Sequence, residues 1–126
     1  MKKFIFLFII LNSALGFSQE AEFSLLEKVY KFPKTNEGVI LNHNFKFENS
    51  GDSPLIISDY NVSCACTKVT LPNKPILPGE KGVIKVSFDT KGKYYLQDRI
   101  VYLTTNTSKK TKKLRFKVYV IPIEEQ

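Results

Sequence analysis

The sequence predicts an all-β protein, an immunoglobulin-like β-sandwich of about seven strands that follows an N-terminal signal peptide. Short runs of residues alternate apolar and polar side chains with a period of two, which is typical of half-buried strands. Turn-type residues separate these runs at short intervals, and no run has the periodicity of an amphipathic helix. This spacing is typical of an immunoglobulin-like sandwich, and a small barrel is the structural alternative.

Residues 1–18 have the composition of a secretory signal peptide. Two lysines follow the initiating methionine, residues 4–11 form an unbroken run of eight apolar residues, and small and polar residues follow. The run is shorter than the roughly 20 apolar residues that a membrane-spanning helix needs, so no permanent membrane anchor is expected. We predict cleavage before Gln19, with Phe17 as the alternative first residue, and an exported protein that is periplasmic or extracellular. Residues 19–126 are then one domain.

Three strands are predicted in the first half of the domain. Residues 23–32 are expected to form a first, edge-like strand. In residues 39–49 the odd positions are mainly apolar and the even positions mostly polar, so one face of this strand is expected to enter the core. Residues 55–62 alternate less clearly, which favours a more central strand.

Three further strands are predicted in the second half. Residues 82–89 and 114–120 alternate clearly, while residues 98–105 alternate less clearly and are expected to be more central. Residues 71–78 contain three prolines, which donate no ladder hydrogen bond, so this segment is predicted to cross between the two sheets. Turn-type segments support the remaining boundaries, at residues 36–38, 49–52, 78–80, 90–93 and 106–108.

A series of short motifs runs through the domain in a fixed order. It begins with apolar and turn positions that comprise Phe45, Phe47, Asn49, Gly51, Pro54, Leu55 and Ile57. The motifs that follow are Ser63-Cys64-Ala65-Cys66-Thr67, Pro78-Gly79-Glu80-Lys81-Gly82, Phe88-Asp89-Thr90 and Thr105-Asn106. In order and content, these motifs resemble a family of exported bacterial immunoglobulin-like domains known as domain of unknown function 1573.

The resemblance implies the fold and export, and it implies no particular activity. The chain departs from the family pattern at three places. Lys31-Phe32-Pro33 stands before the Glu37-Gly38 turn, where the family often has Asp-Phe-Gly. Ala65 stands where the family has a glycine between its cysteines, and Tyr95 stands where it has a glycine after the Asp-Thr turn. The family looks similar to domains of pilus chaperones and major sperm proteins that pack against partner strands, and this likeness is an analogy of fold only.

Cys64 and Cys66 are the only two cysteines of the chain and form the first candidate site. They are interpreted either as small buried residues of the core or as a disulfide with each other. Export favours a disulfide, but an extended backbone holds the two Cβ atoms too far apart, so the bond requires a local turn. A strained bond would be labile and suited to redox chemistry. The remaining interpretations are a Cu(I) site with two thiolate ligands and pairing with another molecule.

His43 is the only histidine, and the alternation places it inward between Leu41 and Phe45. It is interpreted as a half-buried structural residue, or alternatively as a third ligand that helps Cys64 and Cys66 to hold a metal. The chain has no Ser-His-Asp order, no paired-carboxylate motif and no glycine-rich phosphate loop. We therefore expect a protein that is not an enzyme and that uses no cofactor.

A dense run of positive charge leads into the last predicted strand and comprises Lys109, Lys110, Lys112, Lys113 and Arg115. One interpretation is a solvated loop whose charges keep an edge strand from pairing with other chains. The other is a surface patch for anionic glycans, lipid headgroups or a polyanion. Nucleic acid is not an expected partner, because few aromatic side chains accompany these charges.

Two functional hypotheses follow from these observations. The first is a non-catalytic module of the bacterial cell envelope that binds or assembles an envelope protein of unknown identity, by adding a strand at a sheet edge. The alternative is a periplasmic thiol redox or Cu(I)-binding protein that works through Cys64-Ala65-Cys66.

Overall fold

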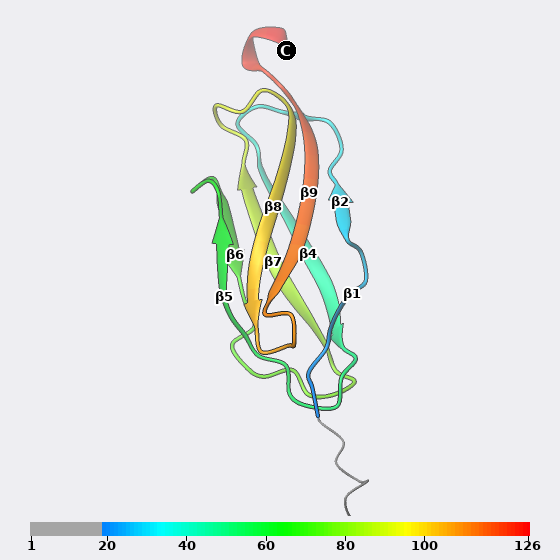
Figure 1. Ribbon diagram of the computed structural model, residues 1–126. Coiled ribbons are helices and arrows are strands. Elements are labelled where there is room, and N and C mark those ends of the chain that lie inside the picture. The colour runs from blue at the N-terminus through cyan, green and yellow to red at the C-terminus, as the bar shows by residue number, and fades with distance from the viewer. Residues whose placement is uncertain (1–18) are drawn as a thin grey trace, which may run out of the picture.

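A computed structural model describes residues 19–126, which form two β-sheets packed face to face (Figure 1). The four-stranded sheet has the order β1 (Phe23–Leu25), β4 (Ile40–Asn49), β7 (Lys81–Asp89) and β6 (Thr67–Thr70). The five-stranded sheet has the order β2 (Val29–Lys31), β9 (Thr111–Ile121), β8 (Tyr95–Thr105) and β5 (Ile57–Val62), and β3 (Thr35–Asn36) also pairs with β9. One 3₁₀ turn, η1 (Ile123–Glu125), follows β9. No helix in residues 19–126 has the length and hydrophobicity to cross a membrane.

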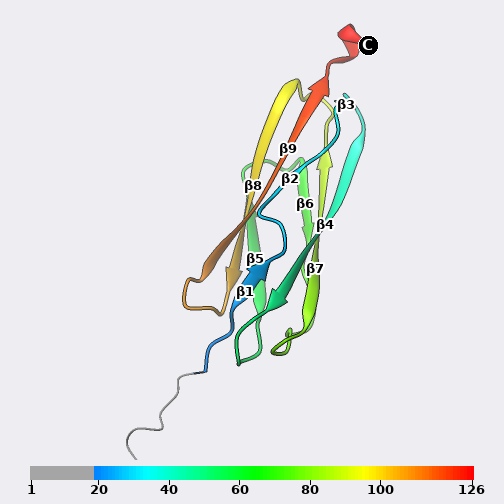
Figure 2. The same cartoon turned by 90° about the vertical axis from the view of Figure 1, so that its right-hand side faces the viewer.

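The predicted all-β sandwich is confirmed, with nine strands in residues 19–126 in place of about seven. The single strand predicted for residues 23–32 is wrong. Its first part is β1, which pairs with β4 in an antiparallel manner, and its last part is β2, which pairs with β9 in a parallel manner. The chain crosses from one sheet to the other between β1 and β2, at one lateral side of the sandwich (Figure 2). The predicted signal peptide, residues 1–18, lies outside the described residues.

The sheet crossing predicted for residues 71–78 is also wrong. This segment joins β6 to β7, which are antiparallel neighbours in the same sheet. Ile76 within it exchanges two backbone hydrogen bonds with Leu55, at 2.8 and 2.9 Å. Proline keeps a segment out of a central ladder, but it does not decide which sheet the next strand joins. The chain crosses between sheets from β1 to β2, from β3 to β4, from β4 to β5, from β5 to β6 and from β7 to β8.

The core lies between the sheets and takes its side chains from the apolar positions of the alternating runs. From the four-stranded sheet, Phe45, Phe47 and Phe88 are fully buried, and Phe116 of β9 meets them from the opposite sheet. The rings of Phe88 and Phe116 pack edge to face with centroids 5.3 Å apart. This confirms the predicted inward face of residues 39–49, 82–89 and 114–120.

Asn49 ends β4 and is the most connected polar side chain inside the domain. Its Oδ1 accepts the amides of Glu22 and Gly51, and its Nδ2 donates to the carbonyls of Ser53 and Ile76. The side chain is completely buried and all of its hydrogen-bonding capacity is used. Asn49 therefore ties together the entry to β1, the turn after β4 and the β6–β7 connection.

Tyr95 is the one non-glycine residue of the described chain with a positive φ, at 64°. This is the position where the family resemblance places a glycine. A side chain in this left-handed region costs about 1 kcal/mol or more. The Tyr95 hydroxyl donates a hydrogen bond of 2.8 Å to Glu125, and this bond raises the pKa of the phenol.

Tyr95→Gly is expected to unfold at higher denaturant concentration than Tyr95→Ala, by about 1 kcal/mol in free energy. Both variants remove the contact with Glu125, so the difference between them reports the cost of a Cβ atom at this backbone angle, less the greater freedom of glycine in the unfolded chain. Urea unfolding followed by circular dichroism measures it. Equal stability of the two variants would show that the backbone at Tyr95 relaxes without cost.

Candidate functional site

The structure joins Cys64 and Cys66 by a disulfide whose Cα atoms are 5.1 Å apart. The pair occupies the turn from β5 to β6, where the Thr67 amide donates 3.1 Å to the Cys64 carbonyl. This turn shortens the distance between the two residues relative to an extended strand, which is the local feature that the bond requires. It carries the chain from the edge of one sheet to the edge of the other.

The disulfide lies partly in the core and partly at the surface. Both are half-buried, Ala65 between them is exposed, and Cys66 packs against the core. The Cys66 carbonyl accepts the amide of Asp89, which fixes this turn to the end of β7. In this oxidised form the sulfur atoms offer no thiolate to a metal, so binding of Cu(I) would first require reduction.

His43 lies away from the cysteines, on the side of the sandwich where β2 runs. Its ring stacks on Tyr30 with centroids 3.5 Å apart, and Phe32 and Phe45 pack against it edge to face. Its Nε2 contacts Glu27. Residues 19–126 contain no group of three or more histidine, cysteine and acidic side chains placed to hold a metal ion. The structure therefore gives His43 a packing environment and does not bring it to Cys64 and Cys66.

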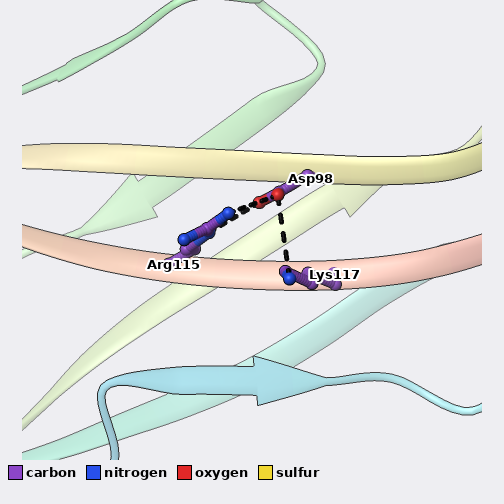
Figure 3. Close-up of polar contacts among 3 residues, drawn as sticks. All are labelled: Asp98, Arg115 and Lys117. Carbon is purple, nitrogen blue, oxygen red and sulfur yellow. Dashed lines mark hydrogen bonds and ion pairs between the residues drawn. The ribbon is translucent and has the colours of Figure 1, made fainter.

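Asp98 already binds part of the predicted basic run. Arg115 donates two hydrogen bonds to the Asp98 carboxylate, at 2.8 and 2.5 Å, and Lys117 lies 3.9 Å from it (Figure 3). The hydrogen bonds from Arg115 lower the pKa of Asp98. This ion pair therefore persists at neutral and mildly acidic pH and is lost only as the pH falls through that lowered pKa.

The edge of β9 that faces away from β8 is only partly covered. β2 pairs with Arg115 to Lys117, and β3 pairs with Val120 and Ile121. Among the described residues, no strand pairs with residues 111–114 on this side. Figure 2 looks onto this side, with β2 along the upper part of β9 and β1 below β2.

The direction of the backbone groups along this edge follows from the hydrogen bonds that later residues of β9 make on the same side. Amides of Phe32 and Glu37 donate to the carbonyls of Lys117 and Ile121, each at 2.9 Å. Odd-numbered residues of β9 therefore direct their backbone groups away from β8. Because the direction of the backbone groups alternates from one residue to the next, Thr111 and Lys113 each direct both their amide and their carbonyl toward the open edge.

A hollow of about 580 Å³ lies against this open edge. Phe23 and Leu25 of β1 line it toward the core, while Ile100 of β8 lines it on the outer face of the five-stranded sheet. The cations that line it are Lys28, Lys112, Lys113 and Arg115. A second hollow of about 310 Å³ shares Lys112 and continues toward residues 20–22 and 107–109.

We call this region the β9 groove: the open edge at residues 111–114 with the larger hollow beside it. It contains three residues of the predicted basic run, namely Lys112, Lys113 and Arg115, whereas Lys109 lines only the second hollow and Lys110 lines neither. Lys28 was missed from the sequence. It is more than 80 positions from Lys112, and only the pairing of β2 with β9 brings it to the groove.

Known structures with the same architecture are distant in sequence. A protein of unknown function from Porphyromonas gingivalis W83 superposes with a TM-score of 0.71 at 13% identity, over 85% of this chain and 50% of that chain. The PapD-like domain 7 of human CEP192 gives 0.58 at 13% identity, over 90% and 93% of the two chains. WR4, a Caenorhabditis elegans member of the MSP family, gives 0.50 at 9% identity, over 82% and 99%. These likenesses show the fold.

The chain thus spans half the length of the Porphyromonas protein. No curated protein matches its sequence. The family described as "Protein of unknown function (DUF1573)" matches residues 23–120, which include every strand except the last residue of β9. This match covers most of the chain, and the protein belongs to the DUF1573 family.

Proposed function

We propose that this protein is an exported, non-catalytic module of the bacterial cell envelope that binds an extended segment of another protein by strand addition. One observation carries the proposal: no strand within residues 19–126 pairs with residues 111–114 on the side of β9 away from β8, and this strand edge lies beside a hollow with apolar side chains. An extended peptide that joins such an edge gains main-chain hydrogen bonds, and its alternate side chains enter the adjoining pocket.

The neighbouring elements favour binding over uncontrolled aggregation. The open part of the edge is only four residues long, and it carries Lys112 and Lys113. Short length and lysine are the features by which natural sheets keep an edge from pairing with any exposed strand. A partner must therefore supply more than backbone groups, which makes selective binding at this edge physically reasonable.

Export is supported by two independent features. The first 18 residues have the order of charge, apolar run and small residues that signal peptides have. The Cys64–Cys66 disulfide suits an oxidising compartment, because cytosolic thiols are kept reduced.

Site-specific photo-crosslinking in cells tests the proposal. A benzoyl-phenylalanine at Lys28, on the rim of the β9 groove, is expected to capture a defined partner segment. The same group at Asp59 of β5, an exposed position on the opposite lateral edge of this sheet, is the matched control. The captured segment, made as a peptide, should bind the purified domain. Equal capture at both positions, or a captured peptide that does not bind, would contradict the proposal.

Thiol chemistry is a second candidate function, favoured by the disulfide in the exposed β5–β6 turn. Reduction would take two electrons and two protons from a dithiol partner and give two free thiols on this protein and a disulfide on the partner. If this is the function, the oxidised protein should accept electrons from such a dithiol protein at catalytic rates.

Replacing both cysteines, as Cys64→Ser with Cys66→Ser, separates this candidate from a purely structural role. The bond closes a very short loop, so its loss should cost on the order of 1.5 kcal/mol by loop entropy, and the domain should stay folded. Urea unfolding and dithiol oxidation are measured on the same sample. Dithiol oxidation by the native protein that is lost in a folded variant supports thiol chemistry, whereas a variant that cannot fold assigns the pair to the core.

A further inference from the structure

We infer that the segment bound in the β9 groove is acidic: an extended strand with apolar side chains toward Phe23 and Leu25 and carboxylates toward Lys28, Lys113 and Arg115. This inference rests on the proposed strand addition and adds to it the chemistry of the partner. It follows from how the two walls of the groove differ, from the balance of charge around it, and from the length of the open edge.

An added strand would have two faces, and the side chains of the protein that each face meets are different. Successive side chains of a strand point to opposite faces of the sheet. On the inner face the strand would meet Phe23 and Leu25, which belong to β1 and pack with the core. Lys112 lies on this side of β9 as well, beyond Leu114 toward the second hollow. On the outer face it would meet Ile100, Lys113 and Arg115. The nitrogen of Lys113 lies 5.7 Å from the centre of the Tyr102 ring on this outer face.

The charge around the larger hollow is one-sided. Among residues 19–126, four cations line it and no acidic side chain does. One of these cations, Arg115, is already paired with Asp98, and Glu27, which precedes Lys28, contacts His43. Lys28, Lys112 and Lys113 form no ion pair with any residue in 19–126. A strand with carboxylates on its outer face would complement this charge, and one with lysines would be repelled.

The second hollow limits how far the acidic part extends. Glu20 and Glu22 line it together with Lys109 and Lys112, so charges of both signs are present there. Acidic side chains are therefore favoured only along residues 111–114, a length of roughly 13 Å at the rise of a strand. This suits a core of about four residues, with two side chains on each face.

A second copy of this chain is a poor occupant by the same reasoning. The sequence carries a formal net charge of +7, and without Lys2 and Lys3 of the predicted signal peptide it still carries +5, so two copies repel each other. An anionic lipid or glycan would match the charge but has no peptide groups for the amide and carbonyl of Lys113. The groove therefore fits an acidic protein segment best.

The test uses two matched peptides, acetylated and amidated, that alternate valine with glutamate or valine with lysine. The glutamate peptide is expected to bind at least about tenfold more tightly at low salt, and the preference should shrink at high salt because the charges are exposed. The amide resonance of Lys113 should shift on binding. The double variant Lys28→Glu with Lys113→Glu should reverse the preference, and Lys68→Glu on the distant strand β6 should leave it unchanged.

Asp98→Asn provides an independent check, because it frees Arg115 from its ion pair. Affinity for the glutamate peptide should rise about two- to fivefold, within the range of one exposed charge. Equal binding of both peptides, with the Lys113 amide shifted, would overturn the acidic partner and leave strand addition intact. No binding of either peptide, with the Lys113 amide unchanged, would count against the proposed function itself.

Three further outcomes would overturn the acidic strand. One is binding of the glutamate peptide without any change at the Lys113 amide, which would indicate a general polyanion surface. Another is binding of phosphatidylglycerol vesicles that the double charge reversal abolishes while neither peptide binds. The third is a concentration-dependent dimer in which the Lys113 amide becomes protected without peptide.

Discussion

Asn49→Asp is expected to destabilise the domain by about 3 to 5 kcal/mol at neutral pH. The carboxylate would lose both Nδ2 donors and would face the carbonyl oxygens of Ser53 and Ile76, which now accept at 2.8 and 2.9 Å. The side chain is fully buried, so water does not replace the lost bonds. Urea unfolding followed by circular dichroism measures the loss.

The same substitution at Asn44, an exposed residue of the same strand, is the control and should change stability by less than about 0.5 kcal/mol. The deficit of Asn49→Asp should shrink as the pH falls, because a protonated carboxyl group recovers one donor. Asn49→Asp and Asn44→Asp variants of equal stability would show that the Asn49 hydrogen bonds do not hold these segments together.

Phe116→Ala is expected to cost about 3 to 5 kcal/mol, the range for removing a fully buried aromatic side chain. Its ring packs edge to face against Phe88 of the opposite sheet and against Phe32 after β2, with centroids 5.3 and 5.8 Å away. The loss therefore affects both the contact between the sheets and the attachment of β2. Thermal and urea unfolding of the same sample measure it.

Tyr102→Ala is the control for this change, because Tyr102 is an aromatic residue on the outer face of β8 with 40% of its surface exposed. Its removal should cost less than about 1 kcal/mol. Phe116→Leu should fall between the two, since it retains part of the buried volume. If the two alanine variants had the same free energy of unfolding, Phe116 would not be a central residue of the core.

The strands with clear alternation could be predicted because each stays in one sheet with one face buried. Residues 39–49 correspond to β4, and residues 114–120 lie within β9. The break within residues 23–32 could not be predicted in this way. Both halves place apolar side chains in the core, but they do so from different sheets. The second half forms a strand by pairing with an edge of β9, about 85 positions away in the sequence.

The candidate sites divide in the same manner. The turn at Cys64 and Cys66 was foreseen as the condition for their disulfide, since it depends on neighbouring residues. The family resemblance marked Tyr95 as a position for glycine, and its φ is positive. The β9 groove could not be predicted from the sequence. It exists because β2 pairs with β9 only from Arg115 onward, which leaves residues 111–114 open and places Lys28 in the same hollow as Lys112.

Amide hydrogen exchange at four successive residues of β9 tests strand addition most directly. In the free protein, Thr111 and Lys113 should exchange fast, because their amides face the open edge, while Lys112 and Leu114, which face β8, should exchange slowly. The partner segment identified by photo-crosslinking is then added as a synthetic peptide. When it binds, the Lys113 amide should exchange as slowly as the Leu114 amide. A bound peptide that leaves Lys113 exchanging fast would contradict strand addition at this edge.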